Sequence, residues 1–409
     1  MSPSVTLLGG SPQQRRWLLI PLGMVILLCL GSVYSWSIFR TPLEQELGIS
    51  ATESLLPYTF VLFFYALWMP ITGFYIPRLG TRRTTAIGGL VVGLGYLLAS
   101  VAPSVPWLVV TYGLIGGTGI GITYGVPMAV VARWFPDKKG LAVGATIVGF
   151  GLSPLITAPL ANTLIEAYGV RPTLRLLGLA FMAIICLLSL AMKSPPPDWC
   201  PTTLTGRSPV VNRSSYPSPV LKSRSFYGLW GCYAIATVIG LSAIGISSPV
   251  GEEVIQISGP AAARSVSLFA LFNGLSRPLS GWLADRFKPH HMAIASYSLM
   301  ILACSLMVGA QTGQVGRYWV AFCLFWFCLG GWLAMAPTIT LRFFDPEHYA
   351  QNYGLVFTAY GVGALLGTWG TGQVRDLWGS YTYGFYPMAL LAIAGIVWAS
   401  LFLKRETIL

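Results

Sequence analysis

Apolar and polar positions follow one another along this chain in long blocks. Apolar runs of about 20 residues succeed one another from Trp17 almost to the last residue, and short polar segments separate them. Inside a lipid bilayer every backbone polar group has to be paired within its own segment, so runs of this length are typical of membrane-spanning helices. The pattern predicts an all-α membrane protein with twelve transmembrane helices. The predicted spans are 16–40, 53–77, 82–102, 105–134, 139–168, 172–193, 224–250, 260–286, 290–311, 316–343, 350–375 and 380–403.

The composition agrees with this pattern. Of the 409 residues, 55% are hydrophobic and only 9% are charged, whereas about a quarter of the residues of a soluble protein are charged. The cysteines show no paired ligand spacing. We find no nucleophile triad, phosphate-binding loop, metal cluster or cofactor motif, so the sequence does not indicate an enzyme or an ATP-driven pump.

The basic residues indicate the orientation. Eighteen Lys and Arg residues fall on the side that holds both termini and six on the other. The positive-inside rule therefore predicts a multi-pass protein of the cell (inner) membrane with both termini in the cytoplasm. The net charge of +12 is explained by topology, so membrane lipid and not nucleic acid is the expected neighbour.

The two halves of the chain repeat each other. The segment "RWFPDKKG" at 133–140 corresponds to "RFFDPEHY" at 342–349, and "GFYIPRLGTRR" at 73–83 corresponds to "GWLADRFKPHH" at 281–291, at offsets of 209 and 208. Internal repeats of this kind are frequent in transporter folds. We therefore predict an N-terminal six-helix bundle (1–193), a Pro- and Ser-rich cytoplasmic linker (194–223) and a C-terminal six-helix bundle (224–409).

This pattern resembles the major facilitator superfamily. That family carries the cytoplasmic signature G-x-x-x-D-R-x-G-R-R between helices 2 and 3, and again between helices 8 and 9. The resemblance implies the major facilitator fold, two pseudo-symmetric six-helix bundles, and a conformational role for the matching residues, although Pro77 stands where the first copy should have its acid. The matching residues are Gly73, Arg78, Arg82, Gly281, Asp285 and Arg286.

Arg277 is the most informative single residue. Between Ser265 and Leu283 it is the one ionisable side chain, and it lies about 12 Å of helix from Asp285, too far for easy escape to the membrane surface. The carboxylates of the chain fall near helix ends or in loops, so no fixed acid is expected to neutralise it. A buried cation without a built-in partner is best explained by an anion that binds and leaves, although a structural brace stays possible. Asn273, one turn earlier, shares its helix face.

Within the superfamily the chain is most similar to bacterial oxalate/formate antiporters and monocarboxylate transporters. The best segments are "YSWSIF" (34–39), "GITYGVPM" (121–128) and "NGLSRPLSGWLADR" (273–286). The resemblance implies that Arg277 binds a carboxylate. Oxalate carriers have a second buried cation, a lysine, where this chain has Tyr360, and one cation favours a substrate with one negative charge.

The same resemblance implies a set of substrate-binding residues. It comprises Arg277, Asn273, Tyr34, Tyr124, Phe150, Leu329, Leu333 and Tyr360.

The sequence thus leads to the hypothesis of a secondary active transporter for small monocarboxylates such as L-lactate or pyruvate. We expect a proton as co-substrate and alternating access to a central site, with no cofactor and no metal. The alternative is a carboxylate anion exchanger of the oxalate/formate type. A receptor is disfavoured because no output domain is apparent. The proton acceptor is left open, since no buried acid is apparent and Arg277 does not deprotonate.

Overall fold

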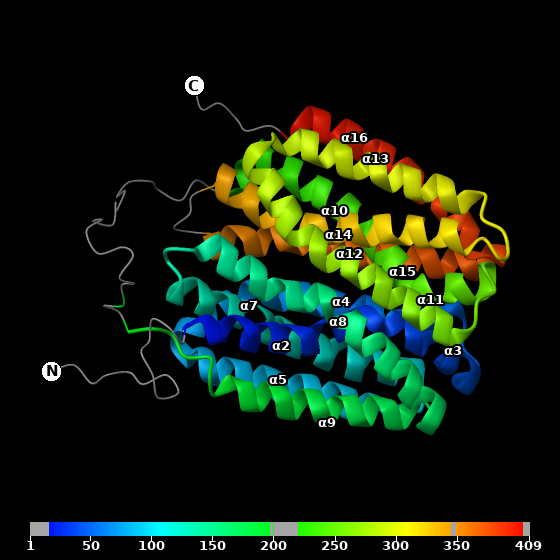
Figure 1. Ribbon diagram of the computed structural model, residues 1–409, viewed down its shortest axis with the longest axis horizontal. Coiled ribbons are helices and arrows are strands. Elements are labelled where there is room, and N and C mark those ends of the chain that lie inside the picture. Colours follow the sequence, from blue (N-terminus) through cyan, green and yellow to red (C-terminus); the bar gives the residue numbers. More distant parts are fainter. Residues whose placement is uncertain (1–15, 197–198, 200–219, 345–348, 404–409) are drawn as a thin grey trace.

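The computed structural model describes residues 16–196, 199, 220–344 and 349–403. The described residues are mostly helical and contain no strand. They form twelve long helical segments in two groups that lie side by side (Figure 1). We call the group up to α9 the N-terminal half and the group from η5 onward the C-terminal half. The prediction of a twelve-helix membrane protein is confirmed.

The helix bounds of the N-terminal half agree with the predicted spans to within several residues. Its first segment is broken by a short 3₁₀ turn, and its fourth contains a stretch of π-helix. The elements are η1 (Arg16–Leu18), α2 (Leu19–Gly31), η2 (Ser32–Ser35), α3 (Trp36–Leu47), α4 (Ala51–Leu79), α5 (Thr81–Ala99), α6 (Val105–Leu108), η3 (Val109–Gly116), α7 (Gly117–Trp134), α8 (Lys139–Tyr168) and α9 (Val170–Ser189).

The C-terminal half follows the same order. Its first predicted span, 224–250, is interrupted after Gly245 and continues as two short elements. The elements are η5 (Val220–Lys222), α10 (Arg224–Gly245), α11 (Ser247–Pro249), η6 (Val250–Val254), α12 (Gly259–Arg286), α13 (Pro289–Val308), α14 (Val315–Phe343), α15 (Tyr349–Trp378), η8 (Tyr381–Gly384) and α16 (Phe385–Phe402).

Local chemistry sets the turn between α3 and α4. Gly48 ends α3 with a φ of 63°, which glycine adopts without steric cost. Ser50 then begins α4 with a capping box: its hydroxyl accepts from the Glu53 backbone N–H, and the Glu53 carboxylate accepts from the Ser50 backbone N–H. These caps extend both helices beyond the predicted spans, which end at residue 40 and begin at residue 53.

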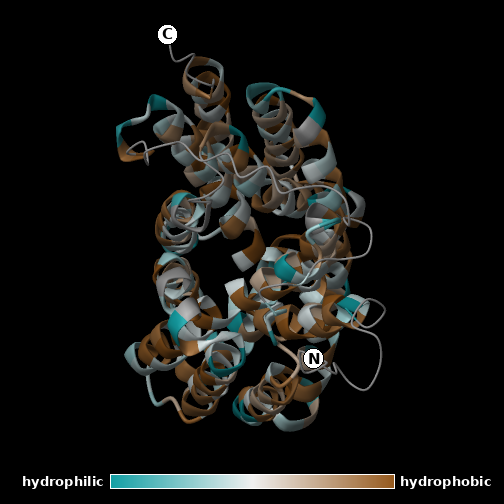
Figure 2. Ribbon diagram, turned by 90° about the vertical axis from the view of Figure 1, so that its left-hand side faces the viewer, coloured by the Kyte–Doolittle hydropathy of each residue, from teal (hydrophilic) through white to brown (hydrophobic). Residues whose placement is uncertain are grey.

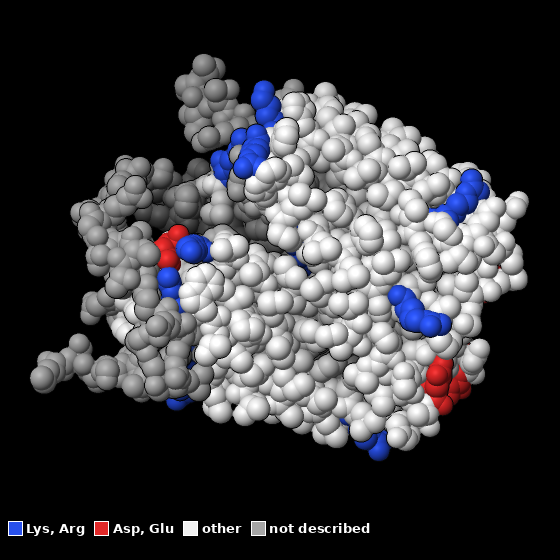
Figure 3. Space-filling model, in the orientation of Figure 1, with Lys and Arg blue, Asp and Glu red and all other residues white. Residues whose placement is uncertain are grey.

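The outer surface is suited to lipid. Nine helices among the described residues are long and apolar enough to cross a membrane; the three remaining long helices are α5, α12 and α15. Most charged side chains visible in Figure 3 lie toward the two ends of the molecule, and hydrophobic positions dominate the ribbon in Figure 2. Because α12 and α15 face the other half, their polar residues are shielded from lipid.

The two halves meet along two helix pairs. Helix α4 packs against α15, and α8 packs against α12. The division into 1–193, 194–223 and 224–409 stays a prediction, because residues 197–198 and 200–219 of the linker lie outside the described part of the chain. The contact between α8 and α12 carries the candidate site.

Candidate functional site

Arg277 lies on α12, nine residues before that helix ends, and only 2% of the residue is exposed. Its Nη1 donates to the carbonyl of Ile147 on α8 at 3.0 Å, and its Nη2 donates to Asn273 Oδ1 at 3.0 Å. Its Nε has no hydrogen-bond partner in the part of the chain that the structure describes. No ion pair joins Arg277 to a carboxylate among the described residues. Arg277 is thus a buried cation without a carboxylate partner among the described residues.

A second buried arginine shows what a fully paired one looks like. Arg40 on α3 is 0% exposed, and all three of its guanidinium nitrogens donate hydrogen bonds. One of its partners is the carboxylate of Glu44, at 3.1 Å. Burying a charge is costly unless it is paired, and Arg40 meets that condition while Arg277 does not. The difference leaves the Nε–H of Arg277 without a hydrogen-bond partner among the described residues.

Asn273 holds the Arg277 guanidinium in place. Its Oδ1 accepts from Arg277, and its Nδ2 donates to the carbonyl of Trp326 on α14 at 2.9 Å. Both ends of the amide are thus engaged, and one Nδ2–H is left for another acceptor. Asn273 is 0% exposed. The predicted neighbourhood of Asn273 and Arg277 is observed.

Gly151 on α8 makes room for this pair. A Cβ atom at this position would lie 2.9 Å from Arg277 Nε and 2.8 Å from Asn273 Oδ1. Real Cβ atoms essentially never come closer than 3.0 Å to other atoms, so any side chain here would displace the guanidinium or the amide. The absence of a side chain at position 151 therefore allows α8 to approach α12 at the site.

Four of the predicted lining residues come together beside Arg277. The hydroxyls of Tyr34 and Tyr360 are 2.8 Å apart and join the two halves. The Phe150 ring lies 5.2 Å from the rings of both Tyr34 and Tyr124, edge to face, and 5.8 Å from the Arg277 guanidinium carbon. Aromatic side chains from η2, α7, α8 and α15 thus form one connected cluster, which meets the guanidinium at Phe150.

The two leucines on α14 are less clearly part of this cluster. Leu329 and Leu333 are buried, and Leu329 lies against Gly240 of α10. Their place in a substrate site stays a prediction.

Sequence reasoning missed three residues of the cluster. Trp326 accepts a hydrogen bond from Asn273, and its ring lies 6.1 Å from Tyr34. Phe357 stacks on Tyr360 at 5.0 Å, and their spacing of three residues on one helix could have indicated this contact. Tyr65 on α4 lies 5.0 Å from Tyr124, and its buried hydroxyl has no hydrogen-bond partner among the described residues. An aromatic residue inside an apolar run, such as Trp326 or Tyr65, gives no sign in the sequence that it belongs to the site.

The residues that match the family signature, here called the conformational motif, lie at two helix junctions, α4 to α5 and α12 to α13. Both junctions are at the end of the bundle where α2 begins and α16 ends (Figure 1). Gly73 lies within α4, and Arg78 and Arg82 are exposed on either side of the turn from α4 to α5. In the second copy Arg286 ends α12, with its guanidinium 3.6 Å from the Trp282 ring centre. Gly281 lies one turn earlier on α12.

The side chain of Asp285, also on α12, lies outside the described part of the structure. The conformational role of the whole motif stays a prediction.

The chain belongs to the Major Facilitator Superfamily, whose pattern matches residues 22–368 and, separately, 234–408. It is 28% identical to the oxalate:formate antiporter of Oxalobacter formigenes, over 86% of this chain and 83% of that protein. It is 27% identical to monocarboxylate transporter 13 of Bos taurus, over 80% of this chain and 74% of that protein. A point mutant of the nucleoside transporter NupG has the same fold, with a TM-score of 0.72 at 13% identity, over 95% of this chain and all of that one.

The protein is therefore a multi-pass membrane transporter of the Major Facilitator type, related to oxalate:formate and monocarboxylate carriers, and not an enzyme.

Proposed function

We propose that this transporter carries small monocarboxylates, with L-lactate and pyruvate as the expected substrates, and that a proton accompanies them. The buried Arg277 guanidinium carries the proposal, because its Nε–H is unpaired while Ile147 and Asn273 hold its other two nitrogens in place. A carboxylate can accept two parallel hydrogen bonds from such an edge. No other described residue combines an unpaired cation with burial between the two halves.

The charge of the site supports a substrate with one carboxylate. Among the described residues of this aromatic cluster Arg277 is the one base, and Tyr360 occupies the place where oxalate carriers have a lysine. A second carboxylate would stay unpaired among Tyr34, Phe150 and Tyr360, at a cost of several kcal/mol. In our proposal the carboxylate of the substrate binds Arg277. The 2-hydroxyl or 2-keto oxygen of the substrate accepts a hydrogen bond from the remaining Nδ2–H of Asn273.

The aromatic side chains would enclose the rest of the molecule. Tyr34, Tyr124, Phe150 and Tyr360 form a connected cluster that meets the guanidinium at Phe150. Leu329 and Leu333 are proposed to supply apolar surface for a short carbon chain. The free hydroxyl of Tyr65 adds a hydrogen-bond donor that sequence reasoning had not included.

Substrate binding would help the site to close. Arg277 on α12 donates to a carbonyl of α8, so this residue links the two halves. A bound carboxylate neutralises the guanidinium, which lowers the cost of excluding water from it. The two halves are then proposed to move about this site and expose it alternately to each side of the cell membrane, with both termini in the cytoplasm.

One observation favours the rival function of anion exchange. No carboxylate among the described residues pairs with Arg277, so the site offers no acidic side chain that would take up a proton with the substrate. An exchanger needs none, because a second anion restores the neutral site on the return step.

Uptake of labelled L-lactate by reconstituted vesicles separates these functions. We expect an inward proton gradient to drive accumulation in vesicles that hold no anion, and a proton ionophore to abolish it. Uptake that requires a preloaded carboxylate and ignores the gradient would establish exchange instead. No uptake of L-lactate or pyruvate under either condition would contradict the proposed substrates.

A further inference from the structure

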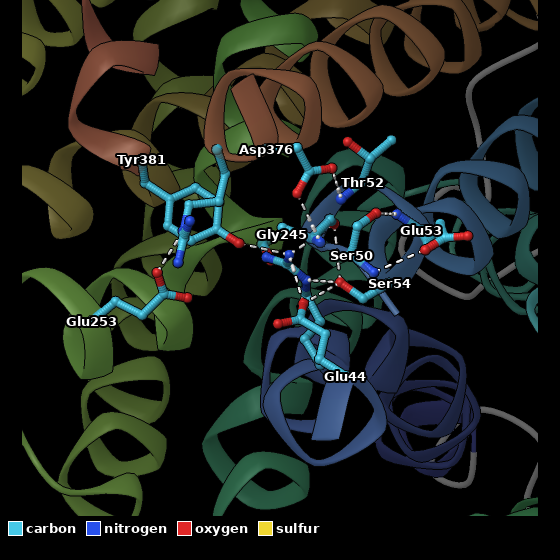
Figure 4. Close-up of polar contacts among 12 residues, drawn as sticks. Glu44, Ser50, Thr52, Glu53, Ser54, Gly245, Glu253, Asp376 and Tyr381 are labelled. Carbon is cyan, nitrogen blue, oxygen red and sulfur yellow. Dashed lines mark hydrogen bonds and ion pairs between the residues drawn. The ribbon is translucent and has the colours of Figure 1, made fainter. Parts of the chain in front are cut away.

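Asp376 reaches from the C-terminal half to the first turn of a helix in the N-terminal half. It lies on α15, and its two carboxylate oxygens accept hydrogen bonds from the backbone N–H groups of Ala51 and Thr52, at 3.0 and 2.9 Å (Figure 4). These residues begin α4, where the N–H groups have no partner within the helix. A negative charge at this end is also favoured by the helix dipole.

Close packing supports this contact. A Cβ atom on Gly372 of α15 would lie 2.6 Å from Thr52 Cα, so the two helices touch backbone to backbone. One residue further along, Gln373 donates to the Thr52 hydroxyl at 3.2 Å. Asp376 is therefore held in register with the first turn of α4.

Arg40 makes the reverse connection, from the N-terminal half to the C-terminal half. Its Nη1 donates to the carbonyl of Gly245 at 3.2 Å, and its Nη2 donates to the hydroxyl of Tyr381 at 2.7 Å (Figure 4). Gly245 ends α10, so the cation sits at the negative end of that helix. Ser54 accepts from Arg40 Nε at 2.9 Å, and Glu44 binds both of these residues. Ser54 and Glu44, which belong to the same half as Arg40, thus hold its guanidinium in position.

We infer that Asp376 and Arg40 form a latch that holds the two halves together at the end of the bundle opposite the start of α2 and the end of α16. Each side chain binds backbone groups at a helix end in the other half, and such groups cannot turn away as side chains can. Both sets of bonds must break before this end of the transporter opens. The inference requires alternating opening of the two ends but does not depend on which substrate is carried.

At the other end of the bundle, the described charged contacts lie within one half. Arg16 pairs with Asp137 inside the N-terminal half, and Arg342 donates to the carbonyls of Ala284 and Phe287 inside the C-terminal half. These contacts do not cross between the halves. The latch therefore keeps one end closed in this structure without an equivalent among the described contacts at the other.

Two ion pairs at the latch end provide matched controls. Arg375 is the neighbour of Asp376 and pairs with Glu253 within the C-terminal half, at 2.7 Å. Arg171 pairs with Glu46 within the N-terminal half. Both arginines are partly exposed, and neither ion pair crosses between the halves. Arg171 is the more distant control, since the Arg375 guanidinium also lies 5.8 Å from the Tyr381 ring.

Thr368 on α15 can report whether this end opens. It is buried, and its hydroxyl bonds to that of Thr59 on α4, on the other half. We would introduce Thr368→Cys into the full chain with its seven native cysteines replaced by serine or alanine. A membrane-impermeant thiol reagent would then be applied from each side of oriented membrane vesicles.

We expect Asp376→Asn, which keeps the shape of the side chain, to speed labelling from the latch side by about tenfold, because charge-assisted hydrogen bonds are lost. Arg40→Gln is expected to act in the same direction, while Arg375→Gln and Arg171→Gln label at the parent rate. Size-exclusion profiles identify any variant that has failed to fold.

Two results would overturn the latch. One is folded Asp376→Asn and Arg40→Gln protein that is labelled at the parent rate. The other is faster labelling from both sides, or an equal effect of Arg375→Gln, since either would indicate general loosening. If the parent protein takes up no lactate but the variants show the expected labelling pattern, the latch stands and only the proposed substrate is contradicted.

Discussion

Two of the three buried arginines among the described residues, Arg40 and Arg277, differ in what surrounds them, and the third, Arg16, is paired with Asp137. Arg40 donates from all three nitrogens to fixed partners, whereas Arg277 keeps its Nε unpaired beside an aromatic cluster. Desolvating a guanidinium costs several kcal/mol unless it is paired. A fully paired arginine is a structural element, and a partly paired one at the centre of a transporter is a candidate for substrate binding.

At the residue scale, Gly151 gives a sharp prediction. In Gly151→Ala the added methyl group would lie 2.9 Å from Arg277 Nε. We therefore expect lactate uptake to fall by at least about fivefold, which corresponds to the lower end of the free-energy cost of overpacking. The matched control is Gly144→Ala on the same helix, where a Cβ atom meets nothing within 4 Å. Initial rates of uptake at equal protein levels measure both. Equal rates for the two variants would show that the guanidinium is not held as described.

The chemistry of single residues also explains which of them could be predicted from the sequence. Arg277 could be found because a single charge in an apolar run is conspicuous. Tyr65 could not, because an aromatic residue in such a run looks the same whether it packs against lipid or lines a site. In the sequence Arg40 is only one of the six basic residues on the side opposite the termini. Its partners Gly245 and Tyr381 lie more than 200 and 300 positions away, so no local pattern connects them.

At the scale of elements, breaks in the helices place the site. The first segment changes from α2 to α3 through the 3₁₀ turn η2, and this turn carries Tyr34 toward Tyr360 on α15. Hydropathy predicted the spans and their order well, because length and polarity determine which segments cross a membrane. It could not predict η2 or the interruption after Gly245, because a break inside an apolar run leaves the hydropathy of the run unchanged.

Helix α15 carries the residue proposed to separate monocarboxylates from oxalate. In Tyr360→Lys we expect oxalate to become an inhibitor of lactate uptake, because a second cation would pair with its second carboxylate. Tyr360→Phe removes only the hydroxyl and is not expected to admit oxalate. Competition by unlabelled oxalate, read from its half-inhibitory concentration, gives the comparison. If oxalate fails to compete in the lysine variant, Tyr360 does not face the substrate.

At the scale of the whole molecule, the internal repeat predicted two similar halves, and the structure shows how they are joined. Helices α4 and α15, and α8 and α12, form the long contacts. The site lies on the second pair and the latch at one end of the first. Neither location follows from the repeat, because a repeat relates positions in the two halves and does not say which of them touch.

The measurement that tests the central proposal most directly is L-lactate uptake by Arg277→Lys. A lysine keeps the charge but not the planar fork that binds both oxygens of a carboxylate, so we expect the initial rate to fall by at least about tenfold. Arg264→Lys is the control, on the exposed part of the same helix. Loss of uptake in the first variant alone supports carboxylate binding by Arg277. Uptake by Arg277→Lys at the parent rate would contradict it.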